Sequence, residues 1–240
     1  MEQKQYELAA QVLREVQKVI LGKREIVEKV LMAVLAQGHV LLDDVPGVGK
    51  TTLAMAFARA LGLETRRVQF TPDTMPSDIL GFSVYDKQAG AFSYQPGAVM
   101  TNLLLADEIN RTSTKTQAAL LEAMEERRVT VDGKTHPLPQ PFFVLATQNP
   151  IEQDGTYPLP EAQMDRFMFK LVVPNPSLNE LMEIVDMTQK TMEEVADAAC
   201  TGEELLEMRA TANQIPVATE VMRYAMYLTS ATPVSYTHLR

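Results

Sequence analysis

The stretch LLDDVPGVGKTTLA, residues 41–54, constrains the fold more than any other part of the chain. A short apolar run leads into a glycine-rich turn, and Lys50 and Thr51 then begin a helical pattern. A strand, a turn and a helix in this order match the phosphate-binding loop G-x-x-x-x-G-K-[ST], except that Asp44 stands at the first glycine. We therefore expect a nucleotide site on an α/β sheet.

Each residue type of this turn suits phosphate recognition. Gly47 and Gly49 let backbone amides turn toward phosphate oxygens, and Lys50 is expected to reach the β- and γ-phosphates. The Thr51 hydroxyl is expected to take one position on Mg²⁺. An ordinary glycine turn with an incidental lysine is disfavoured, because a strand precedes the turn and a helix follows it. The nucleotide-contacting residues predicted from the loop are Pro46, Gly47, Val48, Gly49, Lys50, Thr51 and Thr52.

The rest of the chain alternates short apolar runs with amphipathic helical patterns. This alternation predicts a parallel sheet with helices on both faces. Two segments have hairpin signals, one around Ala89-Gly90 and a stronger one at Asp132-Gly133 between β-forming residues. Past residue 174 the pattern becomes wholly helical. We therefore divide the chain into a core at residues 1–174 and a helical domain at residues 175–240.

Polar residues follow two of the apolar runs. Asp107 and Glu108 end the run NLLLADE, where an aspartate can hold Mg²⁺ through water and a glutamate can act as general base. Asn149 ends VLATQNP and could orient the attacking water, although an Asn-Pro turn explains it better when it is taken alone. Arg166 could stabilise a transferring phosphoryl group. Its alternative is a surface salt bridge with Asp165 or Glu161.

Composition narrows the class of protein. The chain has 22 Lys and Arg against 31 Asp and Glu, a net charge of −9, which argues against general nucleic-acid binding. Its one cysteine, Cys200, cannot form a disulfide within the chain. No run approaches the roughly 20 apolar residues of a membrane span, and the charged N-terminus has no apolar leader segment. We expect a cytoplasmic protein.

Three long segments together resemble the MoxR family of AAA+ ATPases: HVLLDDVPGVGKTTLA, LLLADEINRTSTKTQAALLEAMEE and FFVLATQNPIEQDGTYPLPEAQMDRF. The resemblance runs from about Ile20 to Val173 and continues more weakly into the helical part. It implies a parallel five-stranded P-loop NTPase core with two β-hairpin inserts and a helical lid, which binds ATP and Mg²⁺. The family commonly has a residue other than glycine at the position of Asp44.

The resemblance also assigns roles. Lys50 and Thr51 belong to Walker A, Asp107 and Glu108 to Walker B, and Asn149 is sensor 1. Arg166 is implied to be the arginine finger, offered to the nucleotide of the next subunit in a ring, usually a hexamer. The segment around Ile20 and Gly22 is implied to contact the adenine side of the nucleotide.

The helical part departs from the family pattern. It has no recognisable sensor 2 arginine in a Gly-x-Ser-x-Arg-like segment. The tail at residues 233–240, which includes VSYTHLR, fits no family pattern. We therefore expect residues 175–240 to form a partial lid with an atypical C-terminal tail.

Three functions remain open at this point. The first is a ring that hydrolyses ATP to remodel or mature partner proteins, often with a von Willebrand A domain partner. The second is the motor subunit of a metal chelatase. The third is a nucleotide-dependent binding switch with low turnover. The sequence does not identify a protein substrate.

Overall fold

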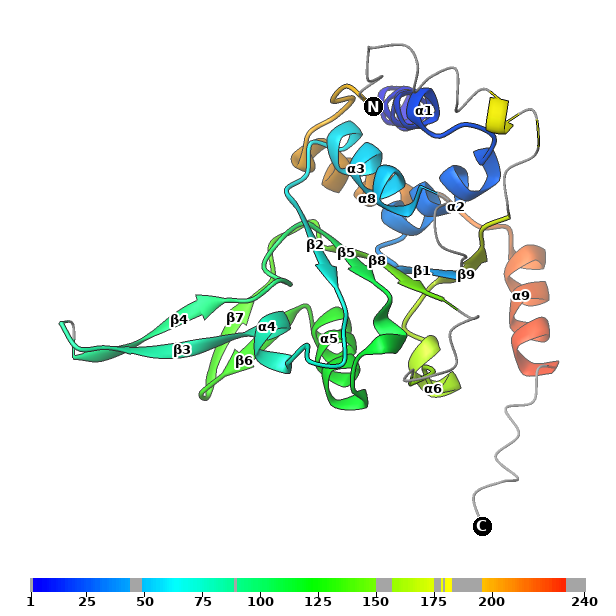
Figure 1. Cartoon of the computed structure of the whole chain (residues 1–240). Helices are drawn as coiled ribbons and strands as arrows, with labels where there is room; N and C mark the ends of the chain where they lie inside the picture. Colours follow the sequence, from blue (N-terminus) through cyan, green and yellow to red (C-terminus); the bar gives the residue numbers. More distant parts are fainter. Residues whose placement is uncertain are drawn as a thin grey trace.

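The computed structural model describes residues 2–43, 49–88, 90–149, 157–174, 178, 180–182 and 196–231. A parallel five-stranded sheet lies at its centre, as predicted, and its strands have the order β2-β5-β8-β1-β9 (Figure 1). The strands are β1 (Val40–Asp43), β2 (Thr65–Gln69), β5 (Leu103–Asp107), β8 (Phe143–Gln148) and β9 (Phe169–Val172).

Helices cover both faces of this sheet, again as predicted (Figure 1). The near-continuous apolar strands need this cover, because neighbouring residues of a strand point to opposite faces. Leu42 packs into a core with the first group of helices, whereas Leu41 packs into a second core with α5. The first group is α1 (Glu2–Val19), α2 (Arg24–Leu35), α3 (Lys50–Ala60) and α8 (Gly202–Ala212), and the second is α4 (Pro76–Leu80), α5 (Thr114–Glu126) and α6 (Glu161–Met164).

Both predicted hairpins are present beside the main sheet. The longer one joins β3 (Gly81–Asp86) to β4 (Ala91–Pro96) and projects from the body of the molecule (Figure 1). The shorter one joins β6 (Arg128–Val131) to β7 (Lys134–Pro137). The rings of Tyr94 and His136 stack with centroids 3.9 Å apart, so the two hairpins contact each other near their bases.

The turn after α2 contains Gln37 and Gly38. Gln37 has the left-handed backbone there, with φ of 60°, although glycine adopts that conformation more readily. Gly38 is needed because a Cβ there would lie 2.6 Å from the Cβ of Met168. The close approach of these two segments brings the start of β1 beside the start of β9.

The predicted helical domain is described only in part. α8 packs into the same core as α1 and α2 through Leu205 and Met208, whereas α9 (Thr219–Ala231) has no buried residue. Both elements are helical as expected, but the boundary at residue 174 remains a prediction. The tail at residues 233–240 lies outside the described residues. Within the described part of the chain, no helix is long and apolar enough to cross a membrane.

Candidate active site

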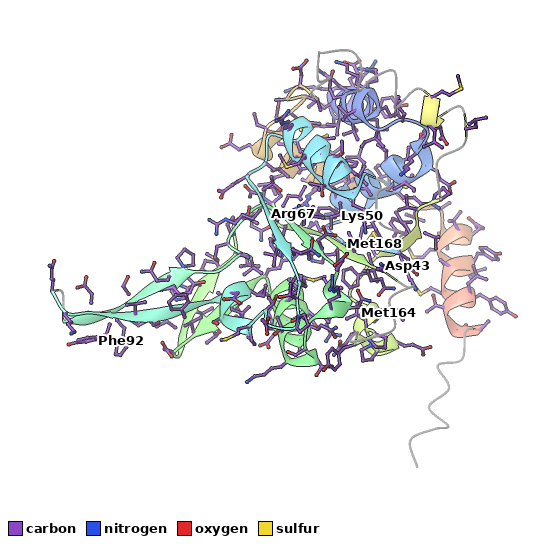
Figure 2. All side chains as sticks on the ribbon, viewed as in Figure 1. Asp43, Lys50, Arg67, Phe92, Met164 and Met168 are labelled. Atoms are coloured by element: carbon purple, nitrogen blue, oxygen red, sulfur yellow. The ribbon has the colours of Figure 1, made fainter. Side chains whose placement is uncertain are left out.

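The phosphate-loop lysine, Lys50, is at the start of α3, which follows β1 in the chain. Gly49 precedes the helix with φ of 85°, a left-handed conformation that glycine adopts without strain. Lys50 is then the first residue of α3, so its side chain and the free amides of the first turn share one end of the helix (Figure 2). Thr51 and Thr52 continue this turn. Pro46, Gly47 and Val48 lie outside the described residues.

A small, mostly apolar hollow lies beside Lys50. Ile20, which the family resemblance places on the adenine side, is one of its lining residues. Gly22 is not, but it has φ of 71° and a Cβ there would overlap the Glu180 carboxylate. An apolar wall next to a phosphate loop suits the flat face of a base. The lining residues are Ile20, Lys23, Ile26, Leu42, Gly49, Lys50, Leu53 and Val173.

Asp107 ends β5 at the same edge of the sheet and is 6% exposed. Its Oδ1 accepts a hydrogen bond from the Thr147 hydroxyl on β8 (2.6 Å). Its Oδ2 accepts one from Arg67 Nη2 on β2 (2.8 Å). Both neighbouring strands therefore supply a donor to this carboxylate, which offsets the cost of burying its charge.

Glu108 follows in an unusual backbone conformation, with φ of 57° and ψ of 50°. Its amide donates to Thr147 Oγ (2.9 Å), so one hydroxyl contacts both acidic residues. Its Oε2 accepts hydrogen bonds from Gln69 Nε2 (2.7 Å) and Arg111 Nη1 (2.9 Å). A non-glycine residue held in this region is strained, and strained residues cluster at functional sites.

Asn149 lies just past the carboxyl end of β8, the strand that pairs with β5, at whose carboxyl end the acidic residues lie. It is 2% exposed and comes directly after β8. Its backbone carbonyl accepts from Asn110 Nδ2 (3.1 Å), and its amide donates to Asn110 Oδ1 (3.4 Å). Asn110 belongs to the short helix η1 (Ile109–Arg111), which follows Glu108. The ends of β5 and β8 are thus fixed to each other.

The donor set fits ATP and Mg²⁺. Thr51 and Asp107 offer hydroxyl and carboxylate oxygens, the ligand type that Mg²⁺ prefers, and Lys50 supplies a positive charge. Among the described residues, no three His, Cys, Asp or Glu side chains are grouped to hold a metal alone. A Mg²⁺ ion at this edge would therefore share its coordination with the phosphates, as Mg²⁺ commonly does.

Arg166 lies at the opposite edge of the sheet. Arg166 lines a cleft of about 440 Å³ together with residues 37–39, which immediately precede β1. Lys50 follows β1, so it lies at the other end of that strand. His39 Nδ1 accepts a hydrogen bond from the amide of Val144, and the His39 backbone carbonyl accepts one from the amide of Met168, at the amino ends of β8 and β9. The cleft is lined by Gln37, Gly38, His39, Met124, Glu125, Arg127, Asp165 and Arg166.

The partner of Arg166 is not one of those considered from the sequence. Its Nη2 and Nε lie 3.0 and 3.1 Å from Glu125 Oε2 on α5, rather than near Asp165 or Glu161. Its Nη1 donates to the carbonyl of Ala162 (3.0 Å). The Glu125 side chain is 60% exposed, so this ion pair is open to solvent.

His39 and Cys200 are both buried and uncharged, which suits residues of the core rather than of a reactive site. Burial lowers the pKa of His39 to about 4, and its Nδ1 accepts a hydrogen bond, so the ring is neutral. Burial also raises the pKa of the Cys200 thiol to about 11, which keeps it protonated and unreactive.

Sequence reasoning missed the donors around the two acidic residues. Arg67 follows Arg66 in a short charged pair of the kind typical of a solvated surface, but it is paired with Asp107. Thr147, Gln69 and Arg111 were not singled out. Thr147 had a detectable signal, since it is a polar residue in an apolar strand that ends beside the expected site. For Gln69 the only signal was its place at the end of β2.

Comparisons with known proteins agree with this arrangement. Residues 39–169 match the family model described as the ATPase family associated with various cellular activities (AAA). The chain is 55% identical to the YeaC protein of Bacillus subtilis over 77% of its length and 58% of that protein. It is 48% identical to Chaperone MoxR1 of Mycobacterium tuberculosis over 83% of its length and 53% of that protein.

A solved structure has the same fold as this chain. The crystal structure of a candidate ATPase from Cytophaga hutchinsonii superposes with a TM-score of 0.86 at 38% identity, covering 96% of this chain and 71% of that one. The chain spans about half the length of the curated relatives it matches. On the strength of the matched family model, the shared fold and these relatives, the chain belongs to the MoxR family of AAA+ ATPases.

Proposed function

We propose that this chain binds ATP and hydrolyses it to ADP and phosphate with the help of Mg²⁺. The observation that carries the proposal is the Thr147 hydroxyl, which joins Asp107 and Glu108 at the edge of the sheet where α3 begins with Lys50. A buried acid, a second acid in strained backbone and a helix terminus with a lysine supply the three elements that phosphoryl transfer to water needs.

Each residue then has one role. Lys50, the loop residues 46–49 and the first amides of α3 bind the phosphates, and Ile20 with its neighbours packs against the base. Thr51 and Asp107 would hold Mg²⁺, which neutralises charge on the phosphate oxygens. Glu108 accepts a proton from the water that attacks the γ-phosphate, and Asn149 orients that water.

Arg166 acts on the nucleotide of another subunit. It lies at the amino edge of the sheet, whereas the phosphate loop of its own chain lies at the carboxyl edge. An arginine placed in this way can reach a γ-phosphate only across a contact between different patches of two copies, and such contacts generate rings when the rotation between copies closes. We therefore propose a homo-oligomeric ring, with six subunits as the expected number.

The ring would couple hydrolysis to remodelling of a partner protein. The similarity to a relative named a chaperone supports this step, and a von Willebrand A domain protein is the expected partner. A low-turnover switch is a second candidate for the isolated subunit, because Glu108 Oε2 is held by both Gln69 and Arg111. A carboxylate oxygen that already accepts two hydrogen bonds is less free to approach the attacking water.

The test is a Glu108→Gln variant. It should bind a fluorescent ATP analogue as wild type does, while phosphate release falls about 10³-fold, because the amide cannot accept the proton. Glu126→Gln is the matched control, since Glu126 is on α5 and pairs only with the exposed Arg128 among the ion pairs described. Wild-type phosphate release by Glu108→Gln would rule out the proposed base.

A further inference from the structure

We propose that Arg67 is the internal counter-cation of the magnesium site, which holds Asp107 when metal is absent and is displaced when metal binds. This inference rests on the proposed function, because it assumes that Mg²⁺ and ATP bind at Asp107. Arg67 is thus a positioning residue that tunes how strongly the site depends on Mg²⁺.

Strand register places Arg67 at the acid. β2 is hydrogen-bonded beside β5, with Arg67 opposite Leu105 and Gln69 opposite Asp107. Arg67 and Gln69 lie two residues apart and therefore on one face of β2. Arg67 Nη2 contacts both Asp107 Oδ2 (2.8 Å) and Gln69 Oε1 (3.2 Å). One guanidinium thus lies between the residue proposed for metal binding and the residue that holds Glu108.

Arg66 provides an internal comparison. As the preceding residue it points to the other face of β2, where Nη1 donates to the carbonyl of Gly97 (3.2 Å) and Nε lies 3.6 Å from Glu64. The two arginines are adjacent, of the same type and similarly exposed, at 41% and 51% of their side chains. They differ in that only Arg67 contacts a buried carboxylate.

The two oxygens of Asp107 have different partners. Oδ1 accepts from Thr147, which is fully buried and fixed in β8. Oδ2 accepts from Arg67, whose side chain is half exposed and can move into water. Oδ2 is therefore the oxygen that can exchange its partner. The exchange keeps the buried carboxylate paired throughout, which avoids the cost of an isolated buried charge.

Arg67 and a hydrated Mg²⁺ compete for Oδ2, because a water of the ion and the Arg67 guanidinium would donate to the same oxygen. The two positive charges also repel, and this repulsion is stronger near a buried group than in water. Binding of Mg²⁺ with ATP must therefore displace the guanidinium, and a part of the metal's binding free energy is used for that displacement. Removing Arg67 should make the metal bind more tightly.

The experiment compares the affinity of a fluorescent ATP analogue in Mg²⁺ with its affinity in EDTA, on the full chain. In Arg67→Gln the ratio of the two affinities should rise about tenfold over wild type, within the usual range for coupled sites. Arg66→Gln should leave the ratio unchanged. Arg67→Lys, which keeps the charge but loses the guanidinium geometry, should give an intermediate value and also serves if Arg67→Gln folds poorly.

A second measurement separates exchange from a merely structural role. Without nucleotide, Arg67→Gln should melt about 3 °C below wild type, because Asp107 loses a partner. With saturating Mg²⁺ and the ATP analogue this deficit should shrink, because the metal replaces the arginine. An equal deficit in both conditions, or an unchanged affinity ratio in a wild-type-like fold, would overturn the inference.

The outcomes also separate this inference from the proposed function. If Lys50→Ala binds the analogue as tightly as wild type in Mg²⁺, then the phosphate-loop site is wrong and the role of Arg67 falls with it. If Lys50→Ala abolishes binding while Arg67→Gln leaves the metal dependence of binding unchanged, then the site stands and only the counter-cation role is wrong.

Discussion

The two edges of the central sheet each hold an arginine–carboxylate pair, in opposite settings. At the carboxyl edge Arg67 pairs with Asp107, whose side chain is 9% exposed and also bonded to Thr147. At the amino edge Arg166 pairs with Glu125, whose side chain is 60% exposed. In the first pair a half-exposed arginine meets a buried, hydrogen-bonded carboxylate, whereas in the second the carboxylate itself is exposed in an open cleft. In the proposed function, the carboxyl edge holds the nucleotide of its own chain and the amino edge meets another subunit.

This difference explains why one chain would be a poor enzyme alone. The carboxyl edge has the phosphate-binding lysine, the buried acid and the base, but the proposed phosphate-stabilising arginine lies at the far edge. Two copies in contact would combine the two edges. Each of the following substitutions changes one edge of the sheet, and the largest expected effect comes first.

Arg166→Ala should lower turnover about 10³-fold at protein concentrations where subunits assemble, because an arginine finger contributes 10³–10⁵ in related phosphoryl transfers. ATP binding by the isolated chain should stay unchanged, since the residue is at the edge remote from its own Lys50. Phosphate release and analogue binding measure the two effects. Arg128→Ala is the control, and a loss of ATP binding in dilute Arg166→Ala would contradict the separation of the edges.

Acid should weaken the amino edge through His39. Burial depresses its folded pKa to about 4, below the usual 6.5, so the unfolded chain binds an extra proton between these values. Stability from this residue is complete above pH 6.5 and is lost as pH falls toward 4. Urea unfolding should show about 2 kcal/mol less stability at pH 5 than at pH 7.5 from this source.

The matched variant for this effect is His39→Asn, whose side-chain oxygen can accept from the Val144 amide in place of Nδ1. It should remove most of the pH dependence between 7.5 and 5. If His39→Asn keeps the wild-type pH dependence, other groups cause the acid sensitivity.

Thr147→Val should test the carboxyl edge with a change of nearly equal shape. The valine removes the hydroxyl that serves both Asp107 and Glu108, leaving a buried acceptor and a buried amide without that partner. We expect a loss of about 1.5 kcal/mol in unfolding free energy, together with slower turnover. Urea denaturation and phosphate release measure these effects, and Thr130→Val on the exposed β6 provides the control. Unchanged turnover would show that the hydroxyl does not position the acids.

Glu125→Gln should give the smallest effect and the opposite sign. The uncharged glutamine side chain would bind Arg166 more weakly than the Glu125 carboxylate does. Less free energy is then needed to move Arg166 toward the nucleotide of a neighbouring subunit. Because the pair is exposed, its strength is below about 1 kcal/mol, and turnover should rise about threefold at most. A concentration series of phosphate release measures it. A decrease in turnover would mean that Glu125 orients Arg166 rather than restraining it.

The carboxyl edge was largely predictable, because it is encoded locally. The glycine turn with Lys50 and the acids after an apolar run are short patterns, and parallel strands bring their carboxyl ends to one edge. The donors to those acids were not predictable in the same way. Arg67 reaches Asp107, 40 residues away, only because β2 pairs with β5 in this register. Sequence periodicity does not specify which strands become neighbours.

The amino edge was less predictable still. Arg166 was identified, but its partner Glu125 is on a different helix 41 residues away, and nearer acids in sequence were better candidates. The left-handed residue after α2 is Gln37, and the glycine that follows it, Gly38, leaves room for Met168. In both cases tertiary packing, rather than local preference, decides the outcome.

Mixing two inactive variants tests the central claim most directly. Lys50→Ala lacks nucleotide binding and Arg166→Ala lacks the finger, so each should be inactive alone. In a mixed ring, an Arg166→Ala subunit keeps Lys50, and a Lys50→Ala neighbour on the correct side supplies Arg166, so the site between them is complete. With equal amounts of both variants mixed at random, about one contact in four is of this kind, and about a quarter of wild-type turnover should return. If mixed rings are formed and turnover stays at the level of the separate variants, the two edges do not form a shared active site.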